Sequence, residues 1–330
     1  MQVSCAFPTT FESPDHVAVA EAIGYERAWL YDTPQNSPDV WVSLALAAER
    51  TERIGLGPGV LIPSLRHPMV NAAATAGLVQ LAPGRLVVAF GTGFSGRRAM
   101  GYGQLSWSFV ERYVAAYAGL LRGEVVVWEG STMQMLHPEG SAPPLPIEVP
   151  ILIAANGPKG REVARRVGVG TFVTGRPHDV EDQLPWVACL TFGTILDDGE
   201  DVAGERVRAA AGPTTALVWH STYEYGGAEA VRALPGGDAW LAVVEQAPVE
   251  RRHLAVHRGH AVELNPADAA AWGAGGSAVA AAATLTGTAE DVGRRLDRLA
   301  ASGVTEVVYQ PAGPDIAREL ERFHAVATGG

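Results

Sequence analysis

A glycine-rich segment, LVVAFGTGFSGRRAMG at residues 86–101, could bind the phosphates of a nucleotide cofactor. Gly91, Gly93 and Gly96 have the spacing G-x-G-x-x-G and follow an apolar run. In a dinucleotide-binding fold such a turn opens directly into a helix, and a second strand ending on an acidic residue completes a unit of about 30 residues. Here RRAMGYGQLS follows, a helical pattern resumes only near Trp107, and no such strand comes next. The context therefore excludes a Rossmann-type site.

A second candidate anion site lies in the segment AANGPKG, at residues 154–160. A predicted strand ends at Ala155 and runs through Asn156 and Gly157 into a helix that begins at Pro158. Free backbone N–H groups and the positive end of the helix dipole would then face the carboxyl end of the strand, which favours a phosphate. Lys159 could add charge or extend into water. Because proline commonly begins helices, an ordinary helix start is the alternative.

Three histidines in RHLAVHRGHAVELN raise the possibility of a metal site. His253, His257 and His260 follow at spacings of four and three residues, which would place them on one helix face. Imidazoles at such spacing could bind a metal and support a metal-dependent hydrolase. No carboxylate at ligand spacing accompanies them, and the segment lies away from every predicted strand end. We therefore interpret them as a hydrogen-bonded or solvent-facing cluster and predict no metal site.

The elements that must position these residues alternate along the chain. Ser13 and Ser37, each followed by proline, predict helix N-caps, and Gly24 is placed to end the first helix. The predicted strands are residues 2–7, 27–32, 53–62, 85–91, 149–156, 171–175, 187–196 and 305–311. They are continuously apolar, as parallel strands covered by helices are. We expect a helical segment after each.

Eight such units fit a single (β/α)8 TIM barrel with insertions after strands 4 and 7. A hairpin at 123–136, turning on Gly130 and Ser131, and a proline-rich loop at 137–150 follow the fourth strand. A mostly helical, alanine-rich insertion at about 201–284 follows the seventh. A doubly wound open sheet is the alternative fold.

Composition limits the class of protein and its partners. The 330 residues are 47% hydrophobic and 18% charged, which allows a large core. A net charge of −11 with scattered basic residues excludes a nucleic-acid footprint. We find no secretory signal, no apolar run near the roughly 18 residues of a membrane helix, and no metal-ligand spacing at Cys5 and Cys189. We expect a cytoplasmic protein that binds neither nucleic acid nor membrane.

Three blocks carry a resemblance to a known superfamily: LVQLAPGRLVVAFGTGFSGRRAMG, VPILIAANGPKGREVARRVGVGTFVTG and GTAEDVGRRLDRLAASGVTEVVYQP. Together they resemble the bacterial-luciferase-like flavin- and deazaflavin-dependent oxidoreductases, and among these the methylenetetrahydromethanopterin reductase-like branch. The resemblance implies one domain over residues 1–330, with FMN or coenzyme F-420 (8-hydroxy-5-deazaflavin) over the C-terminal mouth of the barrel. It also implies a homodimer and an insertion that caps the mouth.

The resemblance assigns roles to particular residues. Asp32, at the end of the second strand, matches an aspartate that deazaflavin-using relatives place near the ring; a turn or helix-capping carboxylate is the alternative. Gly59 and Val60 match a strand bulge that supports one ring face, often through a non-proline cis peptide; an ordinary strand glycine is the alternative. The other implied cofactor-binding residues are Gly91, Thr92 and Gly93 after the fourth strand, Arg97 (or Arg98) toward the phosphate, and Ala155, Asn156, Gly157, Pro158 and Lys159 at the anion site.

The chain departs from relatives that oxidise sugar phosphates with F-420. Those relatives have histidine after the strand 2 aspartate and glutamate after the strand 4 Gly-Thr-Gly, where this chain has Thr33 and Phe94. Neither side chain is an acid or base at neutral pH, so we do not expect sugar-phosphate oxidation, and no catalytic residue is predicted. His220 and His260 are expected on the substrate side of the mouth.

We predict an oxidoreductase that transfers hydride between a flavin-type cofactor and a small organic substrate. F-420 is preferred because of Asp32 and the reductase-like blocks. An FMN-dependent monooxygenase is the first alternative, since the deazaflavin lacks the ring nitrogen through which reduced flavin reacts with oxygen. A non-catalytic flavin-binding protein and a metal-dependent hydrolase are further alternatives.

Overall fold

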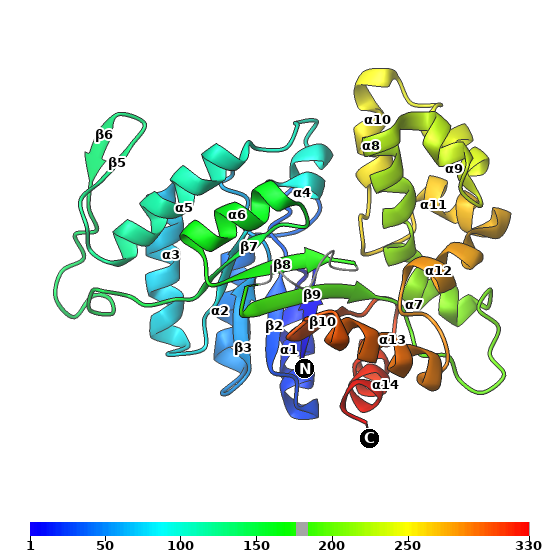
Figure 1. The fold of residues 1–330 in the computed structure, drawn as a ribbon, viewed down its shortest axis with the longest axis horizontal. Helices are drawn as coiled ribbons and strands as arrows, with labels where there is room; N and C mark the ends of the chain where they lie inside the picture. The colour runs from blue at the N-terminus through cyan, green and yellow to red at the C-terminus, as the bar shows by residue number, and fades with distance from the viewer. Residues whose placement is uncertain (176–183, 330) are drawn as a thin grey trace.

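The computed structural model describes residues 1–175 and 184–329, in which an eight-stranded parallel sheet is surrounded by helices (Figure 1). The strands are β1 (Gln2–Phe7), β2 (Arg27–Leu30), β3 (Gly55–Pro58), β4 (Val88–Phe90), β7 (Ile151–Ala154), β8 (Gly170–Thr174), β9 (Trp186–Phe192) and β10 (Glu306–Gln310). Their order is β3-β2-β1-β10-β9-β8-β7-β4, which leaves β3 and β4 at the two ends of the sheet.

Hydrogen bonds between these two ends close the sheet into a barrel. The Leu56 N–H donates to the Arg85 carbonyl at 2.9 Å, and the Val87 N–H donates to the Leu56 carbonyl at 3.0 Å. Further along, the Leu61 N–H donates to the Ala89 carbonyl at 2.8 Å. The predicted TIM barrel is therefore confirmed, and the open sheet is excluded.

Side chains fill the barrel interior, so the barrel is a core and not a channel. The rings of Trp29 and Phe172 meet edge to face, with their centroids 5.1 Å apart. At the amino end of the strands the buried Glu306 accepts hydrogen bonds from the indoles of Trp29 and Trp186 and from Arg27, at 3.0, 2.6 and 2.9 Å. Further buried residues of this interior cluster are small or aliphatic: Ala6, Val87, Ala89, Leu152, Ala188 and Val308. This packing leaves the carboxyl ends of the strands as the open end of the barrel.

Helices cover the outside of the strands, and their apolar faces form the largest core cluster. They are α1 (Ser13–Ile23), α2 (Val40–Arg50), α3 (Pro68–Leu81), α5 (Trp107–Leu121), α6 (Pro158–Val167), α13 (Ala289–Ala301) and α14 (Ile316–Thr328). Gly24 ends α1 at φ 110°, as predicted. The helical segment expected after the sixth strand falls on residues 176–183 and so lies outside the described residues.

Both serine N-cap predictions are wrong. Ser13 is the first residue of α1, and its hydroxyl donates to the Pro8 carbonyl instead of capping. Helix α2 begins three residues after Ser37, and Asp39 caps it by accepting the N–H groups of Trp41 and Val42. In each case the serine hydroxyl is hydrogen-bonded to a residue of the β1–α1 loop, Pro8 for Ser13 and Thr9 for Ser37. The short sequence pattern of an N-cap does not reveal such contacts.

The glycine turn does open directly into a short helix, α4 (Phe94–Ala99), contrary to our expectation. Gly93 is its N-cap at φ 77°, a left-handed conformation that glycine adopts without a Cβ penalty. The six-residue helix is too short to show an apolar period. The exclusion of a Rossmann unit stands, because α5 follows instead of a strand and the sheet is a closed barrel.

The segment after α5 forms the expected hairpin, β5 (Val126–Trp128) and β6 (Ser131–Met133). Its turn is one residue earlier than predicted, on Glu129 and Gly130, at φ 50° and 81°. Ser131 pairs with Trp128 as the first residue of β6, so it belongs to the strand.

A helical lobe between β9 and α13 contains α7 (Glu205–Thr215), α8 (Leu217–Arg232), α9 (Gly237–Val244), α10 (Arg252–His257), α11 (Pro266–Ala271) and α12 (Ser277–Ala283). It stands beside the barrel (yellow-green to orange in Figure 1) and has its own apolar cluster around Trp219 and Trp240. Among the described residues, no helix combines the length and apolar character needed to cross a membrane.

Candidate active site

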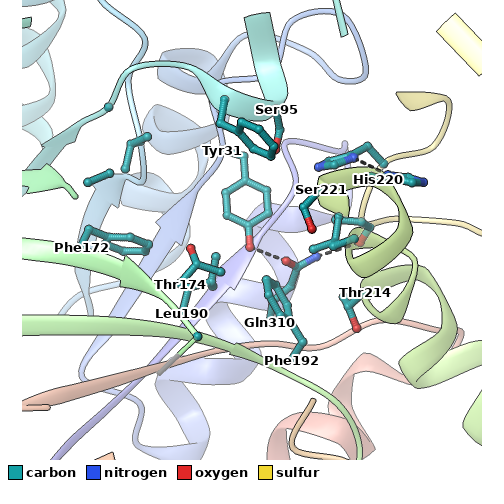
Figure 2. Close-up of a pocket in the computed structure, with 18 of the residues that line it drawn as sticks. Tyr31, Ser95, Phe172, Thr174, Leu190, Phe192, Thr214, His220, Ser221 and Gln310 are labelled. Carbon is teal, nitrogen blue, oxygen red and sulfur yellow. Dashed lines mark hydrogen bonds between the residues drawn. The ribbon is translucent and has the colours of Figure 1, made fainter. Parts of the chain in front are cut away.

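A cavity of about 1160 Å³ lies where the carboxyl ends of the strands meet the helical lobe. Barrel residues on its wall include Tyr31, Phe172, Thr174 and Gln310, and residues of α7 and α8 face them from the lobe (Figure 2). Active sites of TIM barrels lie at this end of the fold. The cavity exceeds the usual range of about 300–1000 Å³ for a single ligand, so it has room for a cofactor and a substrate together.

Most of the predicted cofactor-binding residues come together on this wall. They are Asp32, Gly59, Val60, Gly91, Thr92, Gly93, Ala155, Asn156 and Gly157. Arg97, Pro158 and Lys159 are not among the residues that line it. Residues from four separate strand ends thus meet at one place, as the barrel topology requires.

Gly59, Val60 and Gly91 form a closely packed part of the wall. The Gly59–Val60 peptide bond is cis, the conformation that the family resemblance implied. A Cβ at Gly91 would lie 2.8 Å from Val60 Cγ2 and 3.2 Å from Ala154 Cβ, so no larger residue fits there without a shift. The result is a wall of small side chains that a flat ring could approach.

Asp32 lies two residues beyond the end of β2 and is 2% exposed. Arg66 donates to both of its carboxylate oxygens, at 2.8 and 2.7 Å, and also pairs with Asp39, the N-cap of α2. Burial raises the pKa of Asp32 and outweighs the opposing effect of Arg66. The carboxylate on the cavity wall is therefore already held by a guanidinium.

Asn156 fixes the end of β7 to the end of β8. Its amide donates to the Thr174 carbonyl at 3.1 Å and accepts the Thr174 N–H at 3.2 Å. Gly157 then caps α6 without a side-chain hydrogen bond, and a Cβ there would meet nothing within 4 Å. The N-terminus of α6 is thus exposed, with open space in front of Gly157.

The two arginines considered for phosphate binding both have protein partners. Arg97 donates through Nε to the Gly103 carbonyl at 2.6 Å and through its guanidinium to the Ser64 hydroxyl. Arg98 forms an ion pair with Glu224 of α8 at 2.7 Å. Their contacts join α4 to the neighbouring loops and to the lobe.

Comparison with known proteins identifies the family. The family described as luciferase-like monooxygenase matches residues 12–306. The chain belongs to the luciferase-like monooxygenase family. The predicted superfamily is confirmed, and with it the expectation of an oxidoreductase.

Similar proteins include some whose names describe them as F420-dependent. A 5,10-methylenetetrahydromethanopterin reductase from Methanolobus tindarius is 27% identical over 318 residues, which cover 93% of this chain and 92% of the relative. An F420-dependent glucose-6-phosphate dehydrogenase from Beutenbergia cavernae is 34% identical over 192 residues, 52% of this chain and 56% of the relative. The solved coenzyme F420 dependent tetrahydromethanopterin reductase from Methanopyrus kandleri shares the fold with a TM-score of 0.67 at 20% identity, over 100% of this chain and 99% of that one.

Several residues that line the cavity of this protein were not predicted from the sequence. Tyr31 donates to the side-chain carbonyl of Gln310, whose amide donates to the Ala261 carbonyl of the lobe at 2.8 Å (Figure 2). The rings of Phe94 and Tyr225 stack with their centroids 4.8 Å apart. These residues join the barrel to the lobe, so only the folded arrangement reveals them.

The histidine prediction needs two corrections. Helix α10 ends at His257, so His260 lies in the following turn and not on the same helix face. Carboxylates do accompany the cluster: Glu224 and Asp268 approach it from other helices. As expected, His220 and His260 line the cavity from the lobe side.

Proposed function

We propose that the protein is an F-420-dependent oxidoreductase that transfers hydride between the deazaflavin and a small organic substrate bound in the same cavity. The observation that carries the proposal is that nine of the predicted cofactor-binding residues line one cavity at the strand ends. Relatives named as F420-dependent glucose-6-phosphate dehydrogenases support this cofactor over FMN.

The wall residues fit a flat, phosphate-bearing cofactor. Gly59, Val60 and Gly91 would support one face of the ring, because the small side chains leave its approach open. The N-terminus of α6 at Gly157 would hold the phosphate through backbone N–H groups and the helix dipole. When bound, the cofactor supplies the hydride chemistry, while the barrel orients it and keeps water from the reacting atoms.

The substrate would lie toward the lobe, between the ring site and residues such as Ser221, Tyr225 and His220. Thr33 and Phe94 line the cavity at the positions where sugar-phosphate-oxidising relatives have an acid or base. We therefore propose a substrate other than a sugar phosphate, even though several relatives are named for that reaction. From the family resemblance we also propose a homodimer, which light scattering would test.

Fluorescence titration of the purified protein with F-420 and with FMN tests the proposed function. We expect saturable binding of F-420 at one site per chain and weaker binding of FMN. Tighter binding of FMN would favour the monooxygenase alternative. Binding of neither cofactor would contradict the proposal.

A further inference from the structure

Three histidine nitrogens converge where the lobe meets the cavity. His220 comes from α8, His257 is the last residue of α10, and His260 lies in the turn that follows. Nδ1 of His260 is 3.0 Å from Nδ1 of His220 and 3.4 Å from Nδ1 of His257. The ligand atoms that the three rings can offer lie within 4.8 Å of one another. Figure 2 shows the contact between His220 and the neighbouring ring at the edge of the cavity.

The opposite ring nitrogens are held by carboxylates. Nε2 of His220 is 2.9 Å from Asp268, which also accepts the Trp240 indole N–H at 2.8 Å. Nε2 of His257 is 3.1 Å from Glu224. A histidine that binds a metal typically donates its other ring N–H to a carboxylate in this way, which fixes the tautomer and the ring orientation.

If the Nε2 hydrogens are used for the carboxylates, the three Nδ1 atoms at the centre of the cluster have too few hydrogen-bond donors. In the tautomers in which Nε2–H donates to Asp268 and to Glu224, His220 and His257 each present an Nδ1 lone pair toward His260. Since His260 Nδ1 carries at most one hydrogen, it cannot satisfy both lone pairs with linear hydrogen bonds. A cation at the centre would accept all three lone pairs.

We propose that His220, His257 and His260 bind a divalent transition metal of the zinc type through their Nδ1 atoms. Zinc–nitrogen bonds of about 2.0–2.1 Å in tetrahedral geometry separate two ligand nitrogens by about 3.3–3.4 Å. Two of the three Nδ1 separations, 3.0 and 3.4 Å, are close to this value, and the ligand atoms of all three rings lie within 4.8 Å of one another. Imidazole donors suit zinc and its neighbours in the first transition row.

The charges around the cluster favour a cation. Asp268 is 1% exposed, and its Oδ2 has no hydrogen-bond partner among the described residues. Glu224 is paired with Arg98, whereas among the described residues no arginine or lysine pairs with Asp268. A positive charge that balances the Asp268 carboxylate would therefore have to lie in the histidine cluster. A divalent ion would supply that charge.

Three protein ligands leave one tetrahedral position open. His220 and His260 both line the cavity, so the ion would lie at its edge. It would take water or an oxygen donor of a bound molecule, such as a carboxylate or a hydroxyl group. The metal site does not depend on which flavin-type cofactor the barrel binds, and it can be tested without one.

Metal binding by the full chain tests the inference. The protein is treated with a chelator, dialysed, and titrated with Zn²⁺ and, separately, with Co²⁺, with bound metal measured by elemental mass spectrometry. We expect one Zn²⁺ per chain and an intense visible Co²⁺ spectrum typical of tetrahedral coordination. His257→Ala should weaken binding by at least about tenfold, and Asp268→Asn by about 10- to 100-fold, through loss of the carboxylate partner of a ligand.

His253→Ala is the matched control, because His253 is on the same helix and is not part of the cluster. It should bind Zn²⁺ like the wild-type protein. Failure of the folded wild-type chain to bind Zn²⁺ or Co²⁺, or equal binding by His257→Ala, would overturn the inference and leave a hydrogen-bonded histidine network. If His257→Ala does not fold, the Co²⁺ spectrum of the wild-type chain decides, since a weak octahedral spectrum would contradict the three-histidine site.

Discussion

Asp32 shows how one buried carboxylate depends on its partner. It was predicted from family resemblance as a cofactor-side residue, and the structure places it on the cavity wall, paired with Arg66. Both side chains are largely buried, with 1% and 14% exposed. A buried charge that loses its partner strongly destabilises the folded protein. The pair of Asp32 and Arg66 therefore contributes to the stability of the cavity wall, whether or not Asp32 also contacts a ligand.

Arg66→Ala should therefore lower the free energy of unfolding by about 3 kcal/mol, because it leaves the Asp32 carboxylate buried and unpaired. Urea unfolding followed by circular dichroism would measure this. Arg50→Ala is the control: its pair with Asp15 is exposed and should change stability by about 0–1 kcal/mol. Equal effects of the two substitutions would show that the Asp32 pair is no stronger than a surface pair.

Glu21 of α1 predicts a pH dependence. Burial acts to raise its pKa, but hydrogen bonds from the backbone N–H groups of Ile54, Arg53 and Glu52 outweigh it and hold the pKa below its ordinary value of 4.5. A carboxyl group with a lowered pKa stabilises the fold above the unfolded-state pKa, and this contribution is lost as the pH falls through the folded-state value.

Glu21→Gln should thus destabilise the protein by about 1 kcal/mol at pH 7, and the difference from the wild-type protein should shrink as the pH falls below about 4. Urea denaturation over a pH series would test the sign. Glu139→Gln, in the exposed proline-rich loop, provides the control. A difference that grows with falling pH would contradict the assigned role.

At the scale of the element, α6 offers the clearest test of the phosphate site. Gly157 is its N-cap in an extended conformation, with open space where a Cβ would lie. Aspartate and asparagine are both good N-cap residues of nearly the same shape. Only aspartate would place a negative charge where the phosphate is proposed to bind.

Gly157→Asp should leave the melting temperature equal or raised, yet weaken F-420 binding by about tenfold or more relative to Gly157→Asn, through charge repulsion. Differential scanning fluorimetry and fluorescence titration would provide the two measurements. If both variants bind F-420 equally well, the phosphate does not bind at this helix terminus.

The sequence predicted elements better than it predicted their ends. Apolar runs located all eight strands, because a strand that is buried on both faces consists almost entirely of apolar residues. The caps at Ser13 and Ser37 were misplaced, since those hydroxyls bind partners brought close by the β1–α1 loop. Helix α4 was missed because six residues do not show a period.

At the scale of the whole molecule, the barrel explains which site residues could be found. Gly59 and Gly91 were predicted from the family resemblance, and Asn156 also from the strand-to-helix pattern around it. They meet at one cavity because parallel strands in a closed barrel share one mouth. Contacts between barrel and lobe were not predicted: the link from Tyr31 through Gln310 to Ala261 spans most of the chain. The carboxylates beside the histidines were missed for the same reason, since Glu224 and Asp268 come from separate helices.

The lobe has its own apolar cluster around Trp219 and Trp240, so the cavity is bounded by two separately packed bodies. The barrel wall carries the proposed ring and phosphate sites, and the lobe carries the three histidines. This division separates the two proposals: loss of the metal cluster should leave cofactor binding to the barrel intact.

A crystal structure of the protein with F-420 would show whether the cofactor binds at the strand ends. We expect the deazaflavin ring against the Gly59–Val60 peptide and Gly91, with the phosphate at the N-terminus of α6. A cofactor bound away from the strand ends, or with its phosphate far from Gly157, would contradict it.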